Sequence, residues 1–131
     1  KRYERILERR KEIIGRYDIA FKQLGIEVLE HYNNHYQSSG HLYITRVPGI
    51  SETKRQEIIA KMAEAGVAVN VHYKPLPMMT AYKNMGFDIK DYPNSYRMFA
   101  NEITLPLHTK LTDADVEYVI ENYCRIVKEY I

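Results

Sequence analysis

The chain has 131 residues and a mass of 15.5 kDa, which fits one domain with a single hydrophobic core. Its formal net charge of +2 gives no support for a nucleic acid or an anionic membrane as a partner, and its one cysteine excludes an internal disulfide bond. No apolar run approaches the ~18 residues of a membrane span and no signal peptide is visible, so we expect a cytoplasmic protein.

The N-terminal part of the chain has the pattern of a long amphipathic helix. Apolar side chains recur every three or four residues from Tyr3 to Leu24, and Gly25 follows them, which predicts a helix over residues 1–25. Its basic residues alternate with glutamates at helix spacing, which favours an ion-paired, solvated surface over a nucleic-acid patch. Because helical periodicity is already present at the first residue and no initiator methionine precedes it, we expect a piece of a longer protein.

Two short strands and a polar loop are predicted next. Residues 26–29 indicate an edge strand and residues 41–47 a second strand, which a Pro-Gly pair ends. Three histidines lie in or beside the loop between them, namely His31, His35 and His41. No cysteine or carboxylate accompanies them at ligand spacing, and a loop would not preorganise them, so we predict no metal site here.

A capped helix followed by an alternating segment comes next. Ser51 and Gly66 are typical of the start and end of a helix over residues 51–65. Valines then alternate with other residues over 67–73, which predicts a half-buried strand with one face in the core.

The end of this predicted strand is the one place where chemistry is concentrated. His72 projects from the face opposite the valines, and Pro75 and Pro77 force the chain to leave the sheet, which carries Tyr73 and Lys74 along its rim. Polar groups at such a rim often form binding sites. The residues alone leave a second interpretation open, with an ordinary exposed histidine, a tyrosine packed at the sheet end and a solvated lysine.

The remainder of the chain predicts short helices, a strand and a closing helix. Two helices are expected over residues 78–85 and 91–100, and a proline-interrupted strand over 103–107 at an edge or end of the sheet. Thr112 and Asp115 form a capping arrangement at the start of the last helix. We therefore predict an α/β (α+β) fold, in which a small mixed sheet has helices mainly on one face.

Four segments together resemble a known family: Val-His-Tyr-Lys-Pro-Leu at residues 71–76, Tyr82, Leu-Pro-Leu-His at 105–108 and Leu-Thr-Asp-Ala-Asp-Val at 111–116. They are similar to the C-terminal domain of the DegT/DnrJ/EryC1/StrS aminotransferases, which depend on pyridoxal 5'-phosphate (PLP) and aminate nucleotide-linked keto sugars. The resemblance implies the small domain of a fold-type-I aminotransferase, with residues 1–25 as the long connecting helix and 26–131 as the domain itself.

The resemblance also implies cofactor, partners and site residues. PLP would be held by a lysine of an upstream large domain, the amino donor would be a compound such as glutamate, and a homodimer would share the active site. The pathway would be cell-surface polysaccharide or amino-sugar biosynthesis. His72 and Tyr73 match a pair that lines the mouth of the substrate site in this family, with Lys74 as a third candidate. Pro77 stands where the family often has histidine.

This 131-residue piece would then be catalytically inert and bind no PLP, because the Schiff-base lysine and the phosphate-binding groups lie elsewhere. We further expect Tyr3, Leu7 and Ile14 to be exposed, since the domain that would cover them is missing. The alternative is a free-standing small α/β binding or regulatory module without catalytic activity.

Overall fold

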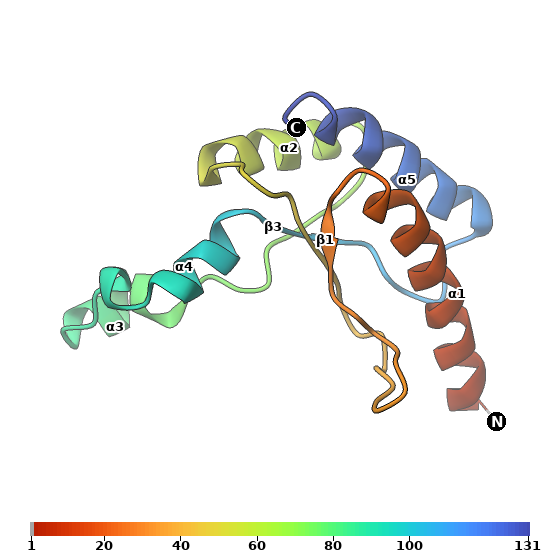
Figure 1. Ribbon diagram of the computed structural model, residues 1–131, viewed down its shortest axis with the longest axis horizontal. Helices are drawn as coiled ribbons and strands as arrows, with labels where there is room; N and C mark the ends of the chain where they lie inside the picture. The colour runs from red at the N-terminus through yellow and green to blue at the C-terminus, as the bar shows by residue number, and fades with distance from the viewer. Residues whose placement is uncertain (1) are drawn as a thin grey trace.

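The computed structural model describes residues 2–131. Its elements, in chain order, are α1 (Arg2–Lys22), β1 (Glu27–Val28), β2 (Tyr43–Arg46), α2 (Glu52–Glu64), the 3₁₀ turn η1 (Leu76–Met78), α3 (Thr80–Asn84), the 3₁₀ turn η2 (Ile89–Asp91), α4 (Pro93–Ala100), β3 (Glu102–Leu105) and α5 (Asp113–Val127). Figure 1 shows α1, α2 and α5 grouped around the strands, while α3 and α4 extend away from them.

The sheet has three strands in the order β1-β2-β3, and both pairings are antiparallel. Arg46 in the central strand lies opposite Glu27 on one side and Glu102 on the other. The prediction of a small sheet with helices mainly on one face is confirmed, and β3 lies at an edge as expected. The prediction of a mixed sheet is wrong, since no parallel pair joins the named strands of residues 2–131.

The predicted strand over residues 67–73 is also wrong. This segment contributes a single antiparallel bridge, in which Asn70 and Thr104 exchange backbone hydrogen bonds of 3.1 and 2.7 Å. The next donor that could extend the ladder, the backbone N–H of His72, instead binds the side chain of Glu102. The segment therefore runs beside β3 without becoming a regular fourth strand.

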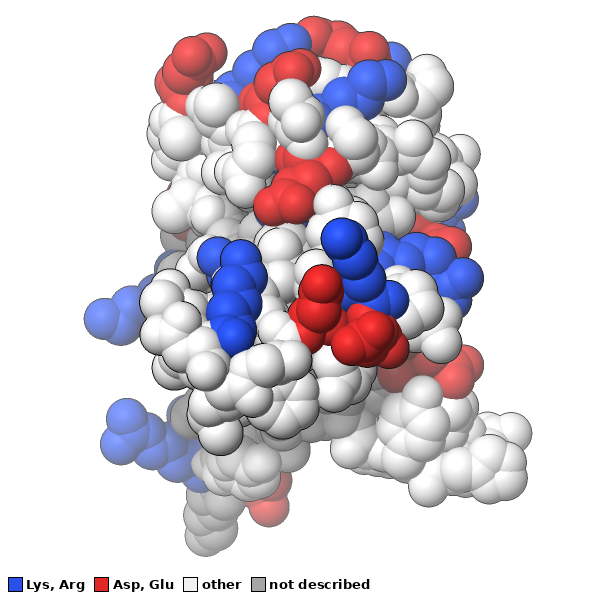
Figure 2. All heavy atoms as spheres, turned by 90° about the vertical axis from the view of Figure 1, so that its left-hand side faces the viewer, with Lys and Arg blue, Asp and Glu red and all other residues white. Residues whose placement is uncertain are grey.

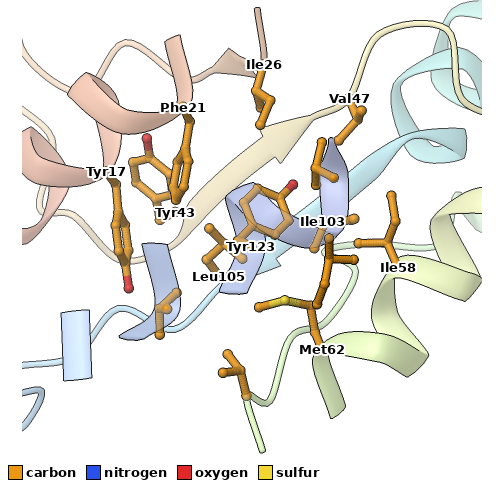
Figure 3. Packing of buried hydrophobic residues seen from close by; sticks show 14 of the residues in the cluster. Tyr17, Phe21, Ile26, Tyr43, Val47, Ile58, Met62, Ile103, Leu105 and Tyr123 are labelled. Carbon is orange, nitrogen blue, oxygen red and sulfur yellow. The ribbon is translucent and has the colours of Figure 1, made fainter. Parts of the chain in front are cut away.

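Three helices and one face of the sheet enclose the hydrophobic core. Tyr43 of β2 points to the helices together with Ile103 and Leu105 of β3 (Figure 3). Because side chains alternate along a strand, the fully buried Thr45 lies on the same face. The helices contribute buried residues to the same cluster: Ile13, Ile14, Tyr17 and Phe21 of α1, Ile58 and Met62 of α2, and Val116, Val119, Tyr123, Ile126 and Val127 of α5.

Three of the twelve tyrosines of the chain lie in this core. The ring of Tyr43 lies 4.9 Å from that of Tyr17, and the ring of Phe21 lies 5.1 Å from that of Tyr123. Each buried hydroxyl finds a partner: Tyr17 donates to the Pro106 carbonyl, Tyr43 donates to the Asp18 carboxylate, and Tyr123 shares a hydrogen bond with Thr45. Tyrosine thus packs the core like an aromatic hydrophobe and satisfies its polar end.

The helix boundaries agree with the capping residues that the sequence contains. Ser51 accepts a hydrogen bond from the backbone N–H of Lys54 at the start of α2, and Thr112 and Asp115 form a reciprocal capping box at the start of α5. Gly66 follows α2 with a φ of +74°, a backbone angle that residues with a Cβ rarely adopt.

The expected exposure of the first helix is confirmed only near its N-terminus. Tyr3 is 61% exposed and Leu7 is partly buried, whereas Ile14 is 2% exposed. The prediction for Ile14 is wrong because the loop after β1 folds back onto α1. A Cβ at Gly40 would lie 3.0 Å from Cδ1 of Ile14, which shows how closely that loop approaches the helix.

The segment from Leu76 to Met98, called the arm below, differs from the rest of the chain. It contains α3 and most of α4, the two predicted short helices, yet none of its residues, all described, is buried. Figure 2 looks onto the side of the molecule from which the arm extends, and uncharged side chains cover most of that view. The most exposed large apolar residue of the arm is Met85, whose exposed fraction is 71%.

Candidate functional site

A cavity of about 230 Å³ lies on the face of the sheet opposite the core. The alternation that sends Tyr43 and Thr45 to the helices sends Ile44 and Arg46 into this cavity. The other residues that line it come from four further parts of the chain: Leu29 after β1, His72, Tyr73 and Pro75, Ser95, Met98 and Phe99 of α4, and Glu102 of β3. We call this side of the sheet the open face, and the side under α1, α2 and α5 the closed face.

The structure brings two of the three predicted site residues together. His72 is partly buried and Tyr73 is 71% exposed, and both line the cavity, with their rings in an edge-to-face contact at 4.8 Å. The peptide bond that joins them is cis. Lys74 is exposed and does not line the cavity, so the structure does not place it with the other two.

Glu102 is a cavity residue that the sequence interpretation missed. It is 4% exposed, and its Oε2 accepts the backbone N–H of His72 at 2.9 Å while its Oε1 accepts the hydroxyl of Thr104. Burial raises the pKa of this carboxyl above its ordinary range, and the hydrogen bonds from Thr104 and His72 partly oppose that shift. The sequence predicted a strand over residues 103–107. Had that strand begun at residue 102, the alternation of side chains along it would have placed Glu102 on the open face.

Arg55 is the second polar residue that the sequence interpretation missed. It lies on α2 and is 1% exposed. Its guanidinium lies 4.4 Å from the ring centre of Phe99, donates a hydrogen bond to the Phe99 carbonyl and donates another to Glu52. Arg55 thereby anchors the C-terminal end of α4, which forms one wall of the cavity. No local pattern in the helix distinguishes it from the solvated lysines and arginines.

One arginine is among the residues that line the cavity. Arg46 lines it and is held by Glu27, with 3.2 Å between Nε of the arginine and Oε2 of the glutamate. Arg46 also lines a neighbouring hollow that contains Arg97 and Met98. The cavity can therefore offer a polar ligand an imidazole, a phenol hydroxyl and a guanidinium from three separate segments.

The residues that line this cavity do not fit a PLP site. Covalent attachment of PLP requires a lysine, and no lysine lines the cavity. The carboxylate that could pair with a pyridinium nitrogen, that of Glu102, is already engaged by His72 and Thr104.

Residues 2–131 contain neither a cluster of metal ligands nor a helix that could span a membrane. No group of three or more histidine, cysteine, aspartate or glutamate side chains is arranged to hold a metal ion in this part of the chain. Within the same residues, no helix combines the length and the apolar character that crossing a membrane requires.

Comparison with known proteins identifies relatives of the chain. Residues 1–123 match the DegT/DnrJ/EryC1/StrS aminotransferase family. The chain is 31% identical over 131 residues to the spore coat polysaccharide biosynthesis protein SpsC of Bacillus subtilis, covering 98% of this chain and 34% of that protein. It is 26% identical over 129 residues to a UDP-4-amino-4,6-dideoxy-N-acetyl-beta-L-altrosamine transaminase of Campylobacter jejuni, again covering 98% and 34%.

Solved structures give the same result. The fold matches the PLP form of the putative sugar aminotransferase Spr1654 from Streptococcus pneumoniae with a TM-score of 0.95 and 52% identity, covering 99% of this chain and 33% of that one. The PMP form of the same protein matches with a TM-score of 0.96. The chain thus spans about a third of the length of the relatives it matches.

Proposed function

Because the chain belongs to the DegT/DnrJ/EryC1/StrS aminotransferase family, we propose that the full-length protein is a PLP-dependent aminotransferase that transfers an amino group to a nucleotide-linked keto sugar. The observation that carries this proposal is the match of nearly the whole chain, at 52% identity, to a sugar aminotransferase solved in a PLP form. Glutamate is the amino donor in this proposal, and the product serves cell-surface polysaccharide or amino-sugar biosynthesis.

The proposal divides the work between two parts of the protein. An upstream large domain would hold PLP, which carries the amino group between donor and acceptor. Residues 1–25 would be the connecting helix and residues 26–131 the small C-terminal domain, and two copies of the full-length chain would form a homodimer. The exposed N-terminal turn of α1, with Tyr3, is consistent with a surface that another part of the protein covers.

Within this chain, the open face would contact the sugar nucleotide. His72 and Tyr73 line the cavity and can donate hydrogen bonds to sugar or phosphate oxygens, and Arg46 adds a positive charge beside them. Lys74, exposed next to this pair, would act at the rim as a further cation. The protein would be located in the cytoplasm, together with the nucleotide sugars that serve as its substrates.

The test uses the purified full-length protein. We expect it to show the visible absorbance of bound PLP, to lose that absorbance on addition of glutamate, and to convert a keto sugar nucleotide to an amino sugar that mass spectrometry detects. The isolated 131-residue chain should show neither absorbance nor conversion. A full-length protein that binds no PLP would refute the proposal and favour a binding or regulatory module.

A further inference from the structure

We infer that Glu102 is a positioning residue, which holds the backbone at His72 so that the side chains of His72 and Tyr73 face the cavity. The hydrogen bonds of the open face alone support this positioning of the backbone. The consequence for substrate binding rests on the proposed function, in which His72 and Tyr73 contact the sugar nucleotide.

The position of Glu102 in the sheet is what allows this role. Regular pairing beside β3 ends at the bridge between Asn70 and Thr104. Two residues further on, the His72 backbone N–H donates to Oε2 of Glu102 at 2.9 Å. Among residues 71–75, all of them described, this is the one backbone hydrogen bond that reaches the sheet. The carboxylate therefore fixes the segment at the residue where its side chains enter the cavity.

The carboxylate is itself fixed. Oε1 of Glu102 accepts the hydroxyl of Thr104, which lies two residues along the same strand and on the same face. The side chain is 4% exposed, so its two hydrogen bonds do not compete with bulk water. A hydrogen bond from a backbone N–H to a carboxylate is stronger than one between neutral groups. A buried carboxylate that is itself held in place can fix the direction of the segment at His72.

An amide could replace the carboxylate in this arrangement. In Glu102→Gln, the side-chain oxygen can still accept the His72 N–H, and the side-chain NH₂ can donate to the Thr104 hydroxyl, which serves as donor or acceptor. Glu102→Ala leaves the N–H of His72 without its acceptor. The two variants therefore separate the hydrogen bond from the charge.

A purely structural role would give a different result, and Thr45→Val provides the matched control. Thr45 is buried in the same sheet but on the closed face, where its hydroxyl bonds Tyr123 and the Ile103 carbonyl. This variant loses buried hydrogen bonds without touching the segment at His72. It reports what lower stability alone does to the enzyme.

The experiment has two readouts on the full-length protein. Hydrogen–deuterium exchange of peptides that cover residues 70–75 measures the positioning directly and needs no activity. We expect exchange about tenfold faster in Glu102→Ala, the factor that the loss of one hydrogen bond gives, and wild-type exchange in Glu102→Gln and Thr45→Val. Should Glu102→Ala not fold, Glu102→Met, of similar length without an oxygen acceptor, takes its place with the same expectation.

The second readout is the kinetics of the two half-reactions. Glu102→Ala should raise KM for the keto sugar nucleotide about tenfold, with the amino-donor half-reaction unchanged and the effect rescued in Glu102→Gln. Unchanged exchange at residues 70–75, equal loss in both half-reactions, or the same defect in the Gln and Ala variants would each overturn the inference. Faster exchange in a protein that aminates no sugar nucleotide would refute the proposed function and leave the positioning of His72 intact.

Discussion

The closed and open faces of the same three-stranded sheet have different chemistry. On the closed face, Tyr43, Thr45 and Ile103 are fully buried under three helices. On the open face, Ile44 and Arg46 remain partly exposed, and a segment without regular structure lies beside β3. Because side chains alternate along each strand, one strand can stabilise the fold with half of its residues and present polar groups with the other half. We therefore expect substitutions on the closed face to reduce stability and those on the open face to change binding.

The largest expected effect on stability is on the closed face. Tyr43→Ala removes a fully buried ring that packs on Tyr17 and Phe21, and should lower the free energy of unfolding by about 3–5 kcal/mol. Urea denaturation of the 131-residue chain measures it. Tyr43→Phe, which loses only the hydrogen bond to Asp18, should cost about 1 kcal/mol. Equal losses in the two variants would show that this ring does not stabilise the core.

A smaller effect, with a defined pH dependence, is expected from the buried carboxyl of the open face. Since burial raises the pKa of Glu102 above its ordinary value of 4.5, the folded state holds the proton more tightly than the unfolded state. The stability that the Glu102 carboxyl contributes is therefore lost as the pH rises from 4.5 through the pKa of the folded state. Glu102→Gln removes this loss, so its stability relative to wild type should increase with pH across that range.

The measurement is the free energy of unfolding of both proteins between about pH 3 and about pH 8. Glu129→Gln is the matched control, because Lys61 lowers the pKa of Glu129 and the stability difference should then change in the opposite direction with pH. A stability difference between Glu102→Gln and wild type that stays constant with pH would contradict the burial assigned to this carboxyl.

The smallest effect on stability is expected in the arm, none of whose residues is buried. Met85→Ser should change the unfolding free energy of the 131-residue chain by no more than about 0.5 kcal/mol, since this side chain is 71% exposed. Thermal unfolding compares it with Met62→Ser, a fully buried methionine on α2 whose replacement should lower the midpoint clearly. Similar shifts in the two variants would mean that the arm belongs to the core.

Local sequence patterns predicted the helices well because amphipathic spacing and caps such as Ser51 and Thr112 act within one turn. The alternating valines gave the wrong result at residues 67–73, because alternation does not reveal that a side chain 30 residues away, Glu102, takes the backbone donor of His72. Arg55 was missed for the same reason, since its partner Phe99 lies 44 residues along the chain.

The prediction of the site residues came from a different kind of information. His72 and Tyr73 belong to segments that resemble a family, and the structure places both of them at the cavity. The same resemblance suggested Lys74, which lies outside the cavity lining. A motif identifies which residues belong together in sequence, whereas the direction of each side chain depends on hydrogen bonds such as the one from His72 to Glu102.

In the proposed function, the open face serves the sugar nucleotide and not the amino donor. This claim is tested most directly by comparing the two half-reactions of the full-length protein in His72→Ala and Tyr73→Phe, with Thr45→Val as the control on the closed face. We predict that each open-face variant slows the keto-sugar half-reaction by about tenfold, the effect of losing one hydrogen bond, and leaves the glutamate half-reaction unchanged. Equal losses in both half-reactions, or no loss in either, would contradict the claim.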